Sequence, residues 1–170
     1  MNIHKKIIKN KFVTIKPFAD EYINKEFVKC INKKSINKYL NIRHKKQTIK
    51  TCIDYLNVLK NNGDLYYAIF SNSQKKLIGT LTLRSYKKKY AFLGYMICYK
   101  KYFGSIESKK SFQIFLKYIF DNSKITKIYA GTEKENIASN FNLIANNFKL
   151  IKKTNKFFWF VLNKKDFILK

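Results

Sequence analysis

The sequence predicts one α/β domain in which helices pack on the faces of a mixed β-sheet. Size and composition are the first observation: 170 residues, 46% hydrophobic and 16% aromatic, suffice for one buried core. The second is the order of strand-like and helix-like segments, β-α-α-β-β-β-α-β-α-β-β. A strand–helix–strand step requires a crossover between strands of one sheet. No repeat or linker interrupts the pattern, so we expect residues 1–170 to form a single domain.

The first third of the chain predicts one strand and two helices. Residues 12–16 alternate and are rich in β-branched side chains, which is typical of a strand, and Pro17 ends it because proline cannot donate to a sheet ladder. A helix is expected over 20–31, where two acidic residues precede apolar residues at helical spacing. A second helix is expected over 48–59, and the Asn- and Gly-containing segment 61–64 closes it.

The rest of the chain alternates strands with two further helices. The segment 90–98 is nearly all apolar, which predicts a central strand buried on both faces. The segment 108–120 carries an apolar stripe at helical spacing. In order, we expect strands at 65–70, 77–84 and 90–98, a helix at 108–120, a strand at 127–131, a helix at 136–146, and strands at 148–151 and 157–162.

The charge of the chain raises the question of nucleic acid. Lys plus Arg is 36 and Asp plus Glu is 10, a formal net charge of +26. Clustered cations bind phosphate backbones, but only Arg43 and Arg84 are arginine, whereas base recognition favours the planar arginine fork. The lysines are spread along the chain, and abundant Lys, Ile and Asn are typical of an AT-rich genome. We therefore do not expect nucleic acid as the partner.

Membrane and metal functions are not expected either. No apolar run approaches the roughly 20 residues of a bilayer span. The three cysteines are far apart and the two histidines cannot complete a zinc site, so no metal centre is predicted. We expect a cytoplasmic protein with reduced thiols.

Two junctions between a strand and a helix carry the candidate chemistry. At the first, the strand 91–97 leads through Tyr102-Phe103-Gly104-Ser105 into a helix, whose free N–H groups and positive dipole end suit a phosphate. Four lysines, 100, 101, 109 and 110, would surround it. Without a ligand, the same residues form an ordinary turn with solvated lysines.

At the second junction, the strand 127–131 leads into the helix at 136–146. At 100° per residue, Asn136, Ser139 and Asn140 share a polar face, and apolar residues occupy the other side. Asn136 also suits the N-cap of that helix, and Ser139 also suits a plain surface position.

Six short motifs stand in order along the chain: Ile15–Pro17, Leu77–Leu81, Leu93–Ile97, Tyr102–Gly104, Asn136–Asn140 and Asn146–Phe148. With them, the chain resembles the GNAT superfamily of acetyl-CoA-dependent N-acetyltransferases, particularly the branch of the ribosomal-protein N-terminal acetyltransferases. The resemblance covers about residues 12 to 160. It implies the GNAT (acyl-CoA N-acyltransferase) fold, a central mixed, mostly antiparallel sheet flanked by helices, with acetyl-CoA as co-substrate.

The resemblance also implies roles for individual residues. The backbone of Met96 and Ile97 would pair with the pantetheine amides where the strand splays from its neighbour. Asn136 resembles the family's cofactor-contacting asparagine, and Ser139 the serine that protonates the departing CoA thiolate. The remaining cofactor-binding residues, around the pyrophosphate, would be Lys101, Phe103, Gly104, Ser105, Ile106, Ser108 and Lys109.

The chain departs from the family pattern at two places. In the phosphate loop, Phe103, Ile106 and Ser108 replace the family's Arg or Gln, Gly, and Gly or Ala, so a branched side chain would stand against the pyrophosphate and weaken its binding. Phe92 stands where many relatives carry an acid. His44 is the candidate general base in its place, and a solvated surface histidine is the alternative.

The acceptor and the degree of activity are left open. The segment 39–46 lies where relatives bind acceptors, so Tyr39, Asn41 and Arg43, together with Tyr95, are the candidate substrate-binding residues. The acceptor is a protein N-terminus or an amino sugar on a nucleotide. The alternatives are a GNAT-fold binding module with impaired catalysis and a basic nucleic-acid-binding protein. We expect a monomer or a homodimer.

Overall fold

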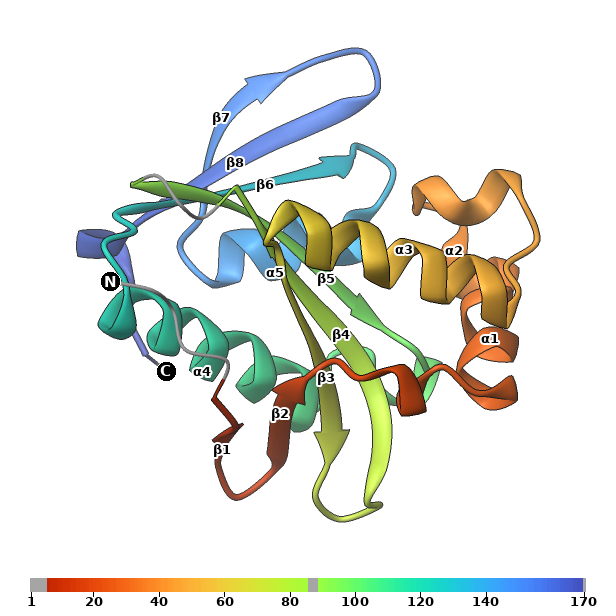
Figure 1. The fold of residues 1–170 in the computed structure, drawn as a ribbon. Helices are drawn as coiled ribbons and strands as arrows, with labels where there is room; N and C mark the ends of the chain where they lie inside the picture. Colours follow the sequence, from red (N-terminus) through yellow and green to blue (C-terminus); the bar gives the residue numbers. More distant parts are fainter. Residues whose placement is uncertain (1–5, 86–88, 170) are drawn as a thin grey trace.

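A computed structural model describes residues 6–85 and 89–169 and contains an eight-stranded sheet, in the order β1-β2-β3-β4-β5-β6-β8-β7 (Figure 1). Only the β5–β6 pair is parallel; the other neighbours are antiparallel. This confirms the predicted mixed, mostly antiparallel sheet. The strands are β1 Ile8–Lys9, β2 Val13–Pro17, β3 Leu65–Ser71, β4 Lys76–Arg84, β5 Tyr90–Ile97, β6 Lys127–Glu133, β7 Lys149–Lys153 and β8 Phe157–Asn163.

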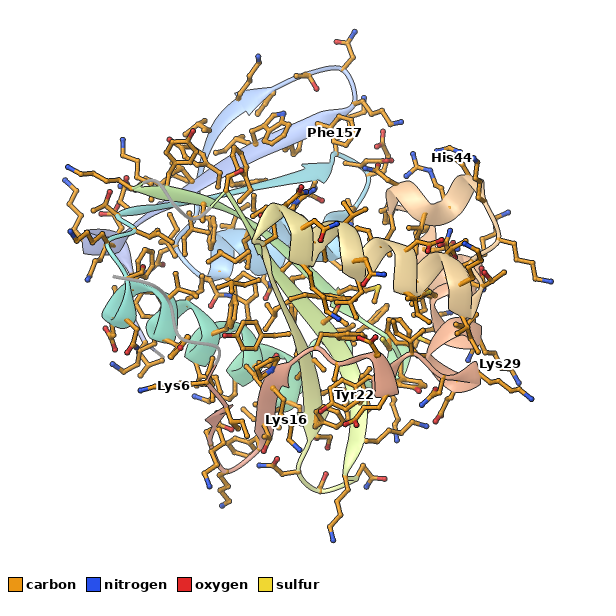
Figure 2. The ribbon with its side chains drawn as sticks, viewed as in Figure 1. Lys6, Lys16, Tyr22, Lys29, His44 and Phe157 are labelled. Carbon is orange, nitrogen blue, oxygen red and sulfur yellow. The ribbon has the colours of Figure 1, made fainter. Side chains whose placement is uncertain are left out.

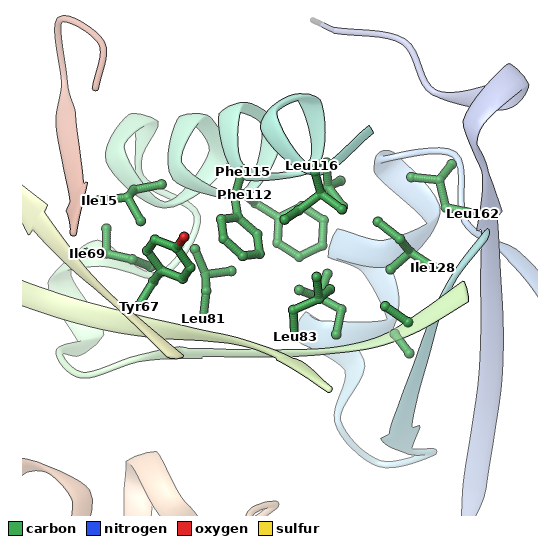
Figure 3. Close-up of a cluster of buried hydrophobic side chains, with 14 of the residues drawn as sticks. Ile15, Tyr67, Ile69, Leu81, Leu83, Phe112, Phe115, Leu116, Ile128 and Leu162 are labelled. Atoms are coloured by element: carbon green, nitrogen blue, oxygen red, sulfur yellow. The ribbon is translucent and has the colours of Figure 1, made fainter. Parts of the chain in front are cut away.

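Helices cover both faces of the sheet. The long helix α4 lies on one face, and α1 and α3 lie on the other (Figure 1, Figure 3). The α-helices are α1 Lys25–Ile31, α2 Lys34–Asn37, α3 Ile49–Asn62, α4 Ile106–Asn122 and α5 Ile137–Ala145. Short 3-10 helices occur at η1 Asp20–Tyr22, η2 Asn41–His44, η3 Lys100–Tyr102 and η4 Lys164–Asp166.

The larger part of the core lies between the sheet and α4. Phe112, Phe115 and Leu116 of α4 are almost fully buried against Tyr67 of β3 and Leu81 of β4, as Figure 3 shows. Burying a large apolar side chain stabilises the fold by roughly 1.5–3 kcal/mol. The apolar stripe predicted for this helix therefore anchors it to the centre of the sheet.

A second cluster fills the opposite face. Phe27 of α1 and Leu56 of α3 pack on Ala68 of β3, and Phe18 stacks on Tyr66 with ring centroids 4.2 Å apart. The three cysteines in the sequence are free and buried in this cluster. No helix in residues 6–85 and 89–169 combines the length and the apolar character that crossing a bilayer requires.

Side-chain caps move two helix starts away from the predicted positions. The helix predicted over 20–31 is divided, because Asn24 accepts a hydrogen bond from the Phe27 N–H and starts α1 at residue 25. Ser105 likewise accepts from the Ser108 N–H, so α4 begins at residue 106 instead of 108.

The central strand β5 is less buried than predicted. Ala91 and Leu93 are buried on the α4 face, but Phe92, Gly94 and Met96 on the other face are only half-buried. The prediction of burial on both faces is therefore wrong for one face of this strand. The strand β1 and the short helices α2 and η2 were also not predicted.

Candidate functional site

The strands β5 and β6 separate partway along their length. They pair at three positions, ending with Phe92 opposite Tyr129. Beyond these positions β5 runs on to Ile97 and β6 to Glu133 without further mutual pairing, while each keeps its other neighbour. The two facing strand edges therefore leave backbone groups available to a ligand that adds to them as a strand would. We call this region, residues 93–97 and 130–133, the β5–β6 opening.

The chain after β5 forms a turn into α4 that resembles the predicted phosphate site only in part. Gly104 has φ +69°, a left-handed conformation that favours glycine. Within the turn, the N–H of Ser105 donates to Tyr102, that of Ser108 to the Ser105 hydroxyl, and that of Lys109 to the Ser105 carbonyl. These three N–H groups are occupied, so an anion would be left with the N–H groups of Gly104 and the first helical residues.

The side chains at this turn are exposed. Phe103 and Ile106 flank Gly104 and are 48% and 44% exposed, and Lys101 and Lys109 are exposed as well. Two of the three replacements noted in the phosphate loop therefore present apolar surface at the start of α4, and the third, Ser108, is buried. A bound molecule that covered them would gain apolar contact but would lose the close approach that a glycine permits.

Tyr95, a candidate substrate-binding residue, is placed elsewhere. Its hydroxyl donates to the Ser108 carbonyl at 2.8 Å and lies 3.3 Å from the Ser111 hydroxyl, and its ring packs against Phe112. Burial raises the pKa of Tyr95, so the hydroxyl stays protonated and keeps donating. The structure therefore assigns Tyr95 to holding the first turn of α4 on β5 and gives no support to an acceptor contact.

Helix α5, which follows β6, turns its polar side inward. Asn140 is buried and Asn136 and Ser139 are half-buried. On the other side Ile137, Phe141 and Ile144 are 74%, 71% and 59% exposed. An amphipathic helix ordinarily buries its apolar stripe, but of the apolar residues in α5 only Leu143 is buried.

Asn136 caps α5 and so determines where the polar residues lie. Its side-chain oxygen accepts from the Ser139 N–H at 3.3 Å. The amide nitrogen of Asn140 donates to the Lys134 carbonyl at 3.0 Å, but its buried side-chain oxygen has no partner among the residues described. Within the same residues no hydrogen bond of the Ser139 hydroxyl is found. The Asn140 oxygen is enclosed by the protein, so the half-buried Asn136 and Ser139 are the polar groups on this side of α5 that a ligand could reach.

The predicted acceptor segment docks on the end of β6. The Arg43 guanidinium lies 2.7 Å from the Glu133 carboxylate, and the Tyr39 hydroxyl donates to the Glu135 carbonyl at 2.8 Å. These contacts bring Tyr39 and Arg43 next to the start of α5. Asn41 and His44 are exposed on η2, and no hydrogen bond to the His44 ring occurs in the described part of the chain. Figure 2 shows His44 at the outer edge of the molecule.

Two features of the site were missed by sequence reasoning. Glu133, the partner of Arg43, has a side chain only 11% exposed, and nothing in the local pattern distinguished it from other acids. Where β5 and β6 still pair, the rings of Phe92 and Tyr129 lie 5.6 Å apart, and Tyr90 meets both edge-on. Alternation along the two strands would have placed these rings on one face.

The arrangement combines unpaired strand edges, two helix beginnings and an inward polar helix face. Strand edges bind amides, helix beginnings bind anions, and a free hydroxyl can donate a proton. No group of three potential metal-ligating side chains is found among the residues described. The site thus suits an extended, amide-containing anion.

A family model described as an acetyltransferase (GNAT) domain matches residues 13–146. No curated protein matches the sequence.

Solved structures share the fold at low sequence identity. The GNAT-family acetyltransferase from Bacillus anthracis is 17% identical with a TM-score of 0.80 and covers 94% of this chain and 99% of its own. RimL, a ribosomal L7/L12 alpha-N-protein acetyltransferase in complex with coenzyme A, is 16% identical and has a TM-score of 0.78. The match covers 93% of this chain and 98% of RimL. FdhC, a nucleotide-linked sugar GNAT, is 16% identical and has a TM-score of 0.75. The match covers 96% of this chain and 93% of FdhC.

Proposed function

Because the chain belongs to the acetyltransferase (GNAT) family, whose co-substrate is acetyl-CoA, we propose that it transfers an acetyl group from acetyl-CoA to a primary amine. The observation that carries this proposal is the inward polar face of α5 beside the β5–β6 opening. A helix that served only to close the core would bury Ile137 and Phe141, which are exposed here.

The residues available around the opening fit the parts of CoA. The free strand edge at Met96 and Ile97 would take the pantetheine amides, and Asn136 would contact them from α5. The beginning of α4 at Gly104, Ser105 and Ile106, with Lys101 and Lys109 beside it, would take the pyrophosphate. The half-buried polar side chains of Asn136 and Ser139 on α5 provide partners for its N–H donors.

The proposed reaction assigns Ser139 the role of general acid. The amine nitrogen forms a bond to the thioester carbonyl carbon, the carbon–sulfur bond breaks, and the Ser139 hydroxyl gives its proton to the leaving sulfur. The proton lost by the amine passes to water or to His44, the base that we propose in the absence of an acid at Phe92. A backbone N–H at the free edge of β5 would stabilise the oxyanion.

Two acceptor classes remain open for this activity. RimL acts on a protein N-terminus, and FdhC acts on a nucleotide-linked sugar. In this chain the segment 39–44 would receive either acceptor, because Tyr39 and Arg43 fasten it to the end of β6. We propose a cytoplasmic enzyme, as a monomer or homodimer, with the acceptor as its partner.

A binding module with impaired catalysis is the second candidate. The observation that favours it is the start of α4, where Ile106 is exposed and three of the N–H groups after Gly104 are already occupied. Such a protein would hold CoA weakly or would hold another ligand in the same opening.

Turnover by the wild-type protein separates the two candidates, and a Ser139→Ala variant tests the general-acid role. An acetyl-transfer assay with amine-terminated peptides and amino sugars should detect CoA release with the wild-type protein. The Ser139→Ala variant should turn over at least about tenfold more slowly, with CoA affinity within about twofold of wild type. Equal losses of turnover and affinity would remove the general-acid role. Binding of CoA without turnover on either acceptor class would favour the binding module.

A further inference from the structure

An open surface hollow of about 500 Å³ lies between α1 and the beginning of α3. Its lining comes from residues of 25–33 and 46–49, and none of it comes from the strands or helices around the β5–β6 opening. Sites for small molecules are typically about 300–1,000 Å³ in volume. The hollow is therefore large enough for a small ligand and is separate from the proposed CoA site.

Four lysines and no acid line this hollow: Lys25, Lys29, Lys33 and Lys46. Lys25 and Lys29 lie four residues apart on α1, a spacing at which like charges destabilise a helix, and Lys33 follows two residues after the end of α1. Ion pairs hold lysines elsewhere, as in Lys76–Glu26, but none involves these four within the described ranges 6–85 and 89–169. Their mutual repulsion would be relieved by a bound anion.

Hydrogen bonds fix the wall between α1 and the segment that follows η2. The Asn32 side chain accepts from the Gln47 N–H at 2.8 Å and donates to the Gln47 carbonyl at 2.9 Å. The Gln47 side chain in turn accepts from the Thr51 hydroxyl in the first turn of α3. The lysines therefore project around a wall that is already ordered.

The remaining lining is apolar or belongs to a helix beginning. Val28 and Ile49 contribute apolar surface. Thr48 caps α3 through the Thr51 N–H, which leaves the N–H groups of Ile49 and Lys50 without an intrahelical partner at the rim. A helix of 14 residues adds its positive dipole end to the lysine charges.

We propose that this hollow is a binding site for a small molecule carrying two linked phosphate groups. The ammonium groups at the rim suit the phosphates, and the mainly apolar floor, which includes Val28 and Ile49, suits an attached apolar or aromatic group. Two sources carry this chemistry: a nucleoside diphosphate, free or attached to an acceptor, and free pyrophosphate. Lys46 ends the segment 39–46, so the site adjoins the proposed acceptor segment.

The test is a titration with pyrophosphate in the absence of CoA, because CoA also carries two linked phosphate groups and would compete for the hollow. Wild type is compared with Lys29→Gln/Lys33→Gln. The matched control, Lys124→Gln/Lys127→Gln, removes the same charge from two exposed lysines at the start of β6, away from α1 (Figure 1). The first pair should weaken binding about tenfold, as expected for two lost lysine–phosphate contacts, and the control by less than about twofold.

Titrations with uridine and adenosine diphosphate identify the source. Tighter binding than that of pyrophosphate, still sensitive to the Lys29/Lys33 pair, indicates a nucleotide, and equal binding indicates pyrophosphate alone. The proposal is overturned if wild type does not bind pyrophosphate, if both lysine pairs weaken binding equally, or if only an oligonucleotide binds. Because no CoA is present, the result does not depend on CoA binding or turnover. Pyrophosphate bound at the start of α4 instead would be insensitive to the Lys29/Lys33 pair, which would also overturn the proposal.

Discussion

The ion pair between Arg43 and Glu133 should stabilise the protein more than a surface pair does. It joins η2 to the end of β6 across a long stretch of sequence, with an N–O distance of 2.7 Å. Its side chains are only 19% and 11% exposed. Removing one partner would leave the other charge partly desolvated, with Lys156 3.9 Å from the carboxylate as the remaining cation.

The magnitude follows from this burial. Exposed pairs contribute about 0.2–1 kcal/mol, and breaking a fully buried pair costs about 3–5 kcal/mol. For this partly buried pair we expect each single variant, Arg43→Met or Glu133→Gln, to lower the free energy of unfolding by about 2 kcal/mol. The coupling energy between them should be about 1.5 kcal/mol. The melting temperature of each single variant should fall by about 4–8 °C.

The assay is a double-mutant cycle by urea denaturation, with the pair Lys50–Asp54 as the control. That pair has the i,i+4 spacing on α3, and its side chains are 84% and 58% exposed. Its coupling should not exceed about 0.5 kcal/mol. A coupling for Arg43–Glu133 no larger than the control value would refute the inference that this contact fastens the acceptor segment.

Three further outcomes are expected. Gly104→Ala should lower the melting temperature by about 2–4 °C by thermal unfolding, because a Cβ there meets no atom within 4 Å and the cost comes from φ +69° alone. Tyr95→Phe should lower the free energy of unfolding by about 1 kcal/mol in urea, because the Ser108 carbonyl loses one of its two hydroxyl donors and keeps only that of Ser111. The Lys76 ammonium lowers the pKa of Glu26 below the unfolded-state pKa of 4.5. At pH values above 4.5 this exposed pair therefore adds about 0.5 kcal/mol to the free energy of unfolding, and this contribution is lost as the pH falls through the folded-state pKa. Denaturation from pH 7 to pH 3 should therefore show a shallower acid limb for Glu26→Gln, and an unchanged limb would contradict the shift.

The order of elements could be predicted because each has a local signal. Alternation and β-branched residues defined β2 to β4, and the apolar stripe of α4 placed its buried face correctly. The two-residue β1 carries too little pattern to be recognised. The helix predicted over 20–31 is divided by the cap at Asn24. The sequence pattern alone did not distinguish this cap from an asparagine on the polar face of a continuous helix.

The candidate site could be predicted only in part, because partners distant in sequence decide it. The polar face of α5 was recognised from spacing, but its inward orientation depends on the packing of Leu143 and Phe148 on the core. The contact of Arg43 with Glu133 spans 90 positions and has no local signal. The occupied N–H groups of the α4 turn depend on the Ser105 cap, which spacing alone did not separate from a free phosphate loop.

Binding of CoA to wild type and to Asn136→Ser tests the central claim most directly. Serine can retain the cap of α5 but lacks the amide proposed to contact pantetheine. Calorimetry should show one CoA per chain for wild type and about tenfold weaker binding for Asn136→Ser, with unfolding free energies within about 0.5 kcal/mol of each other. Absence of binding at millimolar CoA, or equal affinity for the two proteins, would contradict the assignment of the β5–β6 opening as the CoA site.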